Sequence, residues 1–144
     1  MSNLGLVWQL LLAAGLGATI GLEREYRRKP AGLRTNILIA VGSALFTIVS
    51  LHVASKDGTG DRIAAQVVTG IGFLGGGAIL RHGRAIQGMT TAATIWVNAA
   101  IGMAVGAGQR RLAVAATVVT LVVLAVLAPI ERYFDRRFGG YDER

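Results

Sequence analysis

Residues 112–130 read LAVAATVVTLVVLAVLAPI, a stretch of nineteen residues with no charged side chain. A helix of this length reaches about 28 Å, which matches the hydrocarbon core of a bilayer, roughly 30 Å thick. A soluble helix needs a polar face, and the two threonines, Thr117 and Thr120, are too few to supply one. The stretch therefore predicts a transmembrane helix, which Pro129 is expected to help terminate.

Four further apolar stretches precede this one, and the five predicted spans are residues 4–22, 35–54, 63–80, 89–108 and 112–130. Charged residues make up only 16% of the 144 residues, against about 25% in soluble domains. Backbone groups in lipid must be paired within their own segment, which favours helices, and the alternation typical of barrel strands is missing. We therefore predict an all-α, polytopic integral membrane protein with about five transmembrane helices, a transmembrane domain at 1–130 and a short polar cytoplasmic tail at 131–144.

The positions of Lys and Arg predict how the chain crosses the membrane. Eleven of the fifteen lie after the first span, at Arg81 and Arg84, or in the tail, whereas four lie at the opposite ends of the spans. Because basic residues are enriched on the cytoplasmic side, the N-terminus is expected outside and the C-terminus inside. The net charge of +7 comes from these flanks and does not indicate nucleic-acid binding. Arg27, Arg28 and Lys29 are expected to be solvated and to favour anionic lipids on the cytoplasmic side.

The third span is rich in glycine, with five glycines in eight residues: Gly70, Gly72, Gly75, Gly76 and Gly77. One interpretation is close helix packing through small residues, and the other is a locally broken helix whose free carbonyls face a cavity. The pattern GxGxxG also occurs in dinucleotide-binding folds, but no strand precedes it here. Gly102 and Gly106 in the fourth span are open to the same two interpretations of packing or break.

Polar residues inside the spans are few. Asn98 lies about 13 Å into the fourth span, near the membrane midplane, and its amide needs a partner there. The partner is either another helix, through an interhelical hydrogen bond, or a polar path that Asn98 lines. Thr90 and Thr91 open the same span, and Gln66 lies about one turn into the third, so such a path would use them too.

Charged and polar residues at the span ends are the remaining candidates: Glu23, Arg24, Glu25, Arg34, Thr35, Asp61, Arg62 and Arg81. Magnesium prefers oxygen ligands and is usually held by one or two carboxylates with several waters. Because no carboxylate lies in mid-membrane, a magnesium site is expected only at an edge, formed by Asp57 and Asp61 or by Glu23 with Glu25.

Nothing in the sequence indicates an enzyme. There are no cysteines, and His52 and His82 lie at span edges with no nucleophile or metal cluster to pair with. We therefore expect a non-enzymatic role and no resident cofactor, with Mg²⁺ the ion that the span edges could hold.

Several motifs in order resemble the MgtC/SapB family: GLERE at 21–25, AGLRT at 31–35, DRIAAQVVTGIGFLG at 61–75, GMTTAATIW at 88–96 and AAIG at 99–102. The resemblance covers about residues 15–110 with matching spacing. It implies a bacterial inner-membrane protein with about five spans, linked to magnesium limitation and, in some pathogens, to survival inside host cells. It also implies that Glu23, Arg34 and Asp61 are more than solvated end residues.

The resemblance leaves two functions open. The family has been described as magnesium transporters, while some members resemble regulators of other membrane machines such as the ATP synthase. The lack of mid-membrane carboxylates favours a regulator that binds other membrane proteins. The glycine-rich third span beside Asn98 and Gln66 favours a transporter of cations or small solutes that works as a homo-oligomer. Family members often carry a soluble cytoplasmic domain after the last span, where this chain has about fourteen polar residues.

Overall fold

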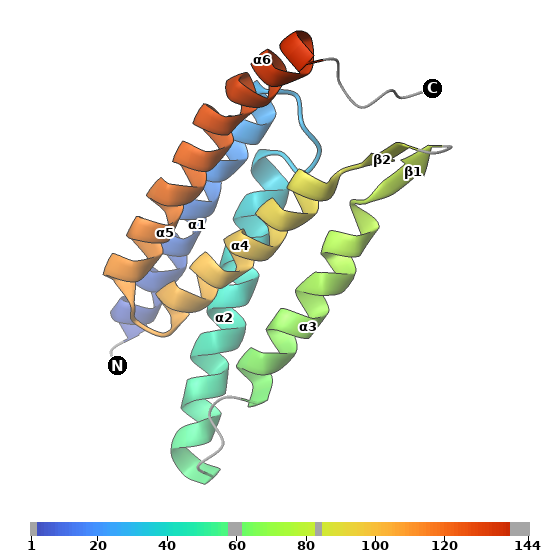
Figure 1. The fold of residues 1–144 in the computed structure, drawn as a ribbon. Coiled ribbons are helices and arrows are strands. Elements are labelled where there is room, and N and C mark those ends of the chain that lie inside the picture. The colour runs from blue at the N-terminus through green and yellow to red at the C-terminus, as the bar shows by residue number, and fades with distance from the viewer. Residues whose placement is uncertain (1–2, 58–61, 83–84, 139–144) are drawn as a thin grey trace.

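The computed structural model describes residues 3–57, 62–82 and 85–138. These residues are helical apart from short connections and a small hairpin (Figure 1). The elements in chain order are α1 (Asn3–Tyr26), α2 (Leu33–Asp57), α3 (Arg62–Gly77), β1 (Leu80–His82), β2 (Ala85–Gln87), α4 (Met89–Gly106), α5 (Arg110–Val122), the π-helical turn η1 (Val123–Leu127) and α6 (Ala128–Phe138). The two short strands pair antiparallel, with Leu80 opposite Gln87.

Four helical stretches among the described residues are long and apolar enough to cross a membrane: Leu4–Tyr26, Leu33–Val53, Met89–Gly106 and Arg110–Ile130. They confirm four of the predicted spans to within a few residues, and the protein is an all-α polytopic membrane protein. The third predicted span, 63–80, is too long. α3 has 16 residues and ends at Gly77, after which the chain turns into β1. A short apolar run can form either a helix or a strand, and hydropathy alone does not distinguish them.

The centre of the bundle is a pair of helices, α2 and α4, that run in the same direction with their backbones in close approach. A Cβ added at Gly102 would lie 2.3 Å from the carbonyl oxygen of Ala40. Small residues at intervals of four allow helices to approach this closely in lipid. The facing pairs, each 62 positions apart in the chain, are Asn36 with Asn98, Ala40 with Gly102, and Ala44 with Gly106.

α1 packs antiparallel against α2 and also contacts α4. A Cβ at Gly17 would lie 2.7 Å from the carbonyl oxygen of Asn36, and one at Gly21 would lie 2.7 Å from the Cα of Leu33. Gly17 of α1 and Gly102 of α4 therefore both face Ala40 of α2, and the three helices pack around one another. The buried apolar core lies among these helices and the α5–η1 segment, and it is formed by Ala13, Ile20, Ala40, Ala44, Ile101, Val105, Ala113 and Leu124.

α3 packs against α4 and α2 at the edge of the bundle (Figure 1). It remains helical from residue 70 to residue 77, so the structure has no break in the glycine-rich segment. A Cβ at Gly75 would touch Ala92 at an ordinary distance of 3.6 Å. The other four glycines of the segment, Gly70, Gly72, Gly76 and Gly77, have nothing within 4 Å of an added Cβ. The close helix packing in this bundle therefore comes from Gly102 and Gly106 rather than from the glycine-rich segment.

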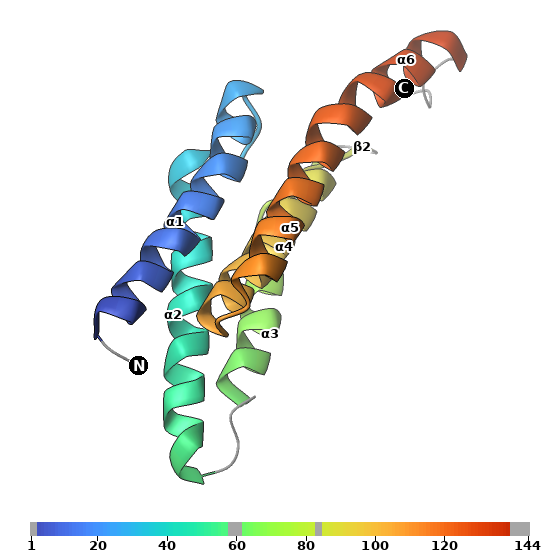
Figure 2. The same ribbon diagram turned by 90° about the vertical axis from the view of Figure 1, so that its left-hand side faces the viewer.

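α5, η1 and α6 follow one another without a break and form one continuous helix (Figure 2). The expectation that Pro129 helps end the last span is wrong, because the helix continues to Phe138. Proline lacks the N–H that would bind the carbonyl four residues earlier, and that carbonyl belongs to Ala125 in η1. A π-helical turn shifts the hydrogen-bonding pattern by one residue, which lets the helix pass the proline.

The basic residues divide between the two ends of the bundle (Figure 1). The α1–α2 loop with Arg27, Arg28 and Lys29 lies at the same end as the hairpin and α6. The start of α1, the end of α2 and the α4–α5 turn with Arg110 and Arg111 lie at the opposite end. This separation is what the positive-inside argument requires, and the assignment of the first end to the cytoplasm stays a prediction.

Candidate functional site

Two buried asparagines, Asn36 on α2 and Asn98 on α4, form the polar centre of the bundle, and both are 0% exposed. The Nδ2 of Asn98 donates to the carbonyl oxygen of Asn36 at 2.7 Å and to its Oδ1 at 3.1 Å. The Nδ2 of Asn36 donates in turn to the carbonyls of Ala31 and Gly32, at 2.5 and 2.9 Å. One network therefore joins α4, α2 and the α1–α2 loop. Within the described chain, the buried Oδ1 of Asn98 has no hydrogen-bond partner.

Arg24, near the end of α1, is only 3% exposed, which is a costly place for a guanidinium group in a membrane span. Its Nη2 donates to the Oγ1 of Thr91 at 2.7 Å, and Thr91 is itself buried at the start of α4. The hydrogen bond joins residues 67 positions apart. Arg24, expected only as an edge residue, thus ties α1 to α4.

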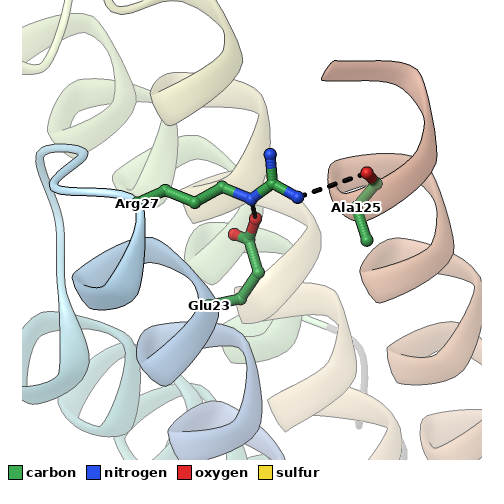
Figure 3. A network of polar contacts seen from close by, with 3 residues as sticks. All are labelled: Glu23, Arg27 and Ala125. Atoms are coloured by element: carbon green, nitrogen blue, oxygen red, sulfur yellow. Dashed lines mark hydrogen bonds and ion pairs between the residues drawn. The ribbon is translucent and has the colours of Figure 1, made fainter. Parts of the chain in front are cut away.

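Arg27 makes an ion pair and a hydrogen bond to the backbone at the same time (Figure 3). Its Nε lies 2.5 Å from Oε1 of Glu23, and its Nη2 donates to the carbonyl oxygen of Ala125 at 3.2 Å. This carbonyl is the one that Pro129 deprives of its α-helical donor. The buried oxygens of Glu23 make no hydrogen bond to other described residues, so the ion pair is what neutralises the carboxylate. With its side chain 25% exposed, Arg27 is not the solvated end residue that was expected.

The link between Arg27 and the proline gives a testable prediction. We expect Arg27→Gln to lower the free energy of unfolding by about 1–2 kcal/mol, because a hydrogen bond from a charged group is lost. In Pro129→Ala, residue 129 regains an N–H that can bind the Ala125 carbonyl, so this carbonyl no longer depends on Arg27. In that background, Arg27→Gln should therefore lower the free energy of unfolding by about half as much. A double-mutant cycle on unfolding in detergent measures this coupling, with the exposed Arg28→Gln as the matched control. Equal costs in both backgrounds would contradict the link.

Glu25 closes the α1–α2 loop. Its Oε2 accepts a hydrogen bond from the N–H of Leu33, the first residue of α2, at 3.1 Å, where the helix dipole favours a negative charge. Arg28 and Ala31 in this loop have φ of 54° and 56°, a conformation that side chains other than glycine rarely adopt. Since Asn36 holds the carbonyl of Ala31, the shape of the loop depends on the buried network.

The profile of the MgtC family matches residues 10–133, which include this loop and every helix of the network. The chain belongs to the MgtC family. It is 54% identical over 125 residues to the "Putative magnesium transporter YhiD" of Escherichia coli, covering 82% of this chain and 58% of that protein. It is 52% identical over 115 residues to Protein MgtC of Salmonella typhimurium, covering 80% of this chain and 49% of that protein. An uncharacterized protein of Synechocystis sp. is 44% identical over 129 residues, or 90% of this chain and 55% of that protein.

The chain spans about half the length of the curated relatives it matches. No solved structure matches it. The resemblance to the MgtC/SapB family that the motifs indicated is thus confirmed as membership of the MgtC family. In this MgtC family chain, the motif at 21–25 supplies Glu23, Arg24 and Glu25, and the motif at 31–35 supplies the loop carbonyls that Asn36 binds.

Four other candidate residues of this MgtC family chain are exposed and make no hydrogen bond to the two asparagines. Arg34 and Thr35 are exposed in the first turn of α2, and Gln66 is exposed on α3. Thr90 is exposed as well, and its carbonyl accepts a hydrogen bond from the hydroxyl of Thr94 at 2.7 Å. The backbone of Arg62 begins α3 and that of Arg81 lies in β1, whereas Asp61 falls outside the described residues. Asn98, expected near the midplane, pairs with the first turn of α2 and so lies closer to the α1–α2 loop.

Glu23 and Glu25, one of the two carboxylate pairs proposed as magnesium ligands, do not share a partner. Among the residues that the structure describes, there is no group of three or more His, Cys, Asp or Glu that could hold a metal ion. Glu23 is paired with Arg27 and Glu25 caps α2, so their carboxylates bind different groups. Asp57 ends α2 at the opposite end of the bundle (Figure 1). A magnesium site at Asp57 and Asp61 stays a prediction.

Three polar residues of the MgtC family fold were missed from the sequence. Asn36 directly follows the AGLRT motif, and an amide inside an apolar span is the same signal that singled out Asn98. Gln9 gives this signal too; it is 3% exposed, and its Oε1 has no hydrogen-bond partner in the described part of the chain. Arg27 gives no such signal, because its partner lies 98 positions away.

Proposed function

We propose that this chain is a bacterial inner-membrane protein that acts in magnesium homeostasis by binding and regulating other membrane proteins. The observation that carries the proposal is that two buried polar side chains, on α4 and α1, each bond to another helix of the same chain. Asn98 binds Asn36, and Arg24 binds Thr91. These side chains hold helices together, whereas a path for a hydrated dication needs oxygen ligands free to replace water. The described residues contain no group of three or more His, Cys, Asp or Glu that could hold a metal ion.

The outward face of α3 supports the binding of another membrane protein. An added Cβ at Gly72 or Gly76 would meet nothing within 4 Å, and Phe73 between them is 84% exposed. Glycines four positions apart allow a second helix to approach closely in lipid. The occupant that we propose for this face is therefore a transmembrane helix of the regulated protein.

A transporter that works as a homo-oligomer is the second candidate. The name of the Escherichia coli relative describes a magnesium transporter. The buried Oδ1 of Asn98, which no described residue binds, is an acceptor that a passing cation could use. Several copies would have to assemble, since buried apolar side chains fill the space among α1, α2, α4, α5 and η1.

The test uses the purified protein in liposomes that contain a magnesium-sensitive dye, with insertion verified. If the protein is a regulator, we expect no magnesium flux into these liposomes. We also expect a photo-cross-linking residue at position 73 to capture a membrane protein in cells, and the same residue at position 119 not to capture it. Position 119 is the control because Val119 is also exposed, but on α5. Flux that is lost in Asn98→Leu and in Asp61→Ala, but kept in Gly72→Ala, would establish the transporter and overturn the proposal.

A further inference from the structure

A groove of about 650 Å³ lies between α2 and α3. Its outer edges are open, because Leu38 and Phe46 on α2 and Leu74 on α3 are all more than half exposed. Most of its lining is apolar: α2 and α3 contribute Leu38, Ile39, Phe46, Val67, Ile71 and Leu74, and α4 contributes Ile95. In a membrane, a groove of this kind faces lipid rather than water.

We propose that the groove binds one acyl chain of an anionic phospholipid whose head group lies beside Arg34. Along α2 the lining runs from Thr35 to Phe46, and eleven residues of helix rise about 16 Å. One leaflet of the hydrocarbon core is about 15 Å thick. The groove therefore has the length of the layer that a single acyl chain occupies in one leaflet.

The charges at one end of the groove select the head group. Arg34 is exposed and directly precedes Thr35, which lines the groove, and it lies one helical turn from Leu38 on the same side of α2. The exposed Arg28 and Lys29 lie in the loop at the same end of the bundle (Figure 1). Basic residues at this depth attract anionic head groups, and the hydroxyl of Thr35 can donate to a phosphate or ester oxygen.

The width of the groove comes from glycine on both walls. Gly42 of α2 and Gly70 of α3 both line it, and a Cβ added at either position would meet nothing within 4 Å. The groove therefore offers space that no described side chain of this protein fills. A flexible chain of methylene groups suits this space, and each methylene group it buries adds to the binding.

The head-group part of the proposal is tested by native mass spectrometry of the purified protein, titrated with phosphatidylglycerol or phosphatidylcholine carrying the same acyl chains. We expect phosphatidylglycerol to bind about five-fold more tightly, the factor for one basic residue at the membrane surface. Arg34→Gln should remove this preference and leave the binding of phosphatidylcholine unchanged. Arg110→Gln, at the opposite end of the bundle, is the control and should keep the preference. A preference that survives Arg34→Gln would overturn the assignment of the head group.

The acyl-chain part is tested by filling the groove. Gly42→Leu and Gly70→Leu place a side chain in open space, so they should fold normally, as helical content and melting verify, and bind both lipids roughly ten-fold more weakly, the factor for losing contact with two methylene groups. Gly72→Leu, in open space on the outward face of the same helix, is the matched control. Equal lipid binding by Gly70→Leu and Gly72→Leu would overturn the proposal. So would a lipid-free dimer that Gly70→Leu dissociates, because a second copy would then fill the groove.

Discussion

Gly102→Ala is expected to destabilise the protein by about 3 kcal/mol, because adding a methyl group to a packed contact typically costs 1–3 kcal/mol or more. The new Cβ would lie 2.3 Å from the carbonyl oxygen of Ala40 and 3.0 Å from its Cα. These are backbone atoms of α2, which cannot rotate away as the end of a side chain can. α4 would have to move away from α2, and this would stretch the bonds between Asn36 and Asn98.

The measurement is the free energy of unfolding in mixed detergent micelles, followed by circular dichroism. Gly72→Ala is the matched control, because the same substitution there meets nothing within 4 Å. In a helix, alanine is favoured over glycine by up to about 1 kcal/mol, so the control should leave stability unchanged or raise it. Equal losses for the two variants would mean that the contact between α2 and α4 is not close.

Asn36→Leu is expected to cost about 2–3 kcal/mol, while Asn98→Leu should cost no more than about 1 kcal/mol, given the usual cost of leaving a buried polar atom unpaired. Removing the amide of Asn36 takes the side-chain donor from the carbonyls of Ala31 and Gly32 and one acceptor from Asn98. Removing the amide of Asn98 takes the side-chain donor from the carbonyl oxygen and the Oδ1 of Asn36, but it also eliminates the unpaired Oδ1 of Asn98. The two changes are the same in chemistry, but Asn36→Leu removes three hydrogen bonds, whereas Asn98→Leu removes two together with an unpaired atom.

Unfolding of the two single variants and the double variant in the same detergent measures this asymmetry and the coupling between the residues. A larger loss for Asn98→Leu than for Asn36→Leu would contradict the hydrogen-bond directions described above. The expected result also decides how Asn98→Leu can be used. A variant that remains folded can report on magnesium flux without a loss of structure confusing the outcome.

The sequence predicts the long helices well, because a bilayer imposes a minimum length and excludes charge from the middle of each span. The uncharged runs in the sequence thus locate α1, α2, α4 and α5 to within a few residues. The end of α3 is less well predicted, because residues 78–80 are as apolar as the helix before them. In the structure the helix ends before these residues, and Leu80 begins β1.

The contacts between helices could not be predicted in the same way. The segment 70–77 is dense in glycine, yet a Cβ added at most of these positions would have no atom within 4 Å. A Cβ added at the more widely spaced Gly102 or Gly106 would meet the backbone of α2. The number of glycines in a segment is a property of one helix. How closely two helices approach depends also on the residue of the second helix that faces each glycine. Arg27 and Ala125 illustrate the same limit, because no local pattern connects an arginine after the first span to a carbonyl in the last.

Because α2 and α4 are partners separated in the chain, one of them is made long before the other. Asn36 and Asn98 are 62 residues apart, and at about 5–20 residues per second the ribosome needs about 3–12 s to synthesise that length. α1 can cover one side of α2 as soon as both helices exist, since Gly17 and Gly21 face it. The Nδ2 of Asn36 can already bind the α1–α2 loop, but its Oδ1 and its carbonyl oxygen receive the amide of Asn98 only when α4 has been made. We therefore expect substitutions that weaken the contact of α4 with α2, such as Gly102→Ala, to lower the yield of correctly inserted chains as well.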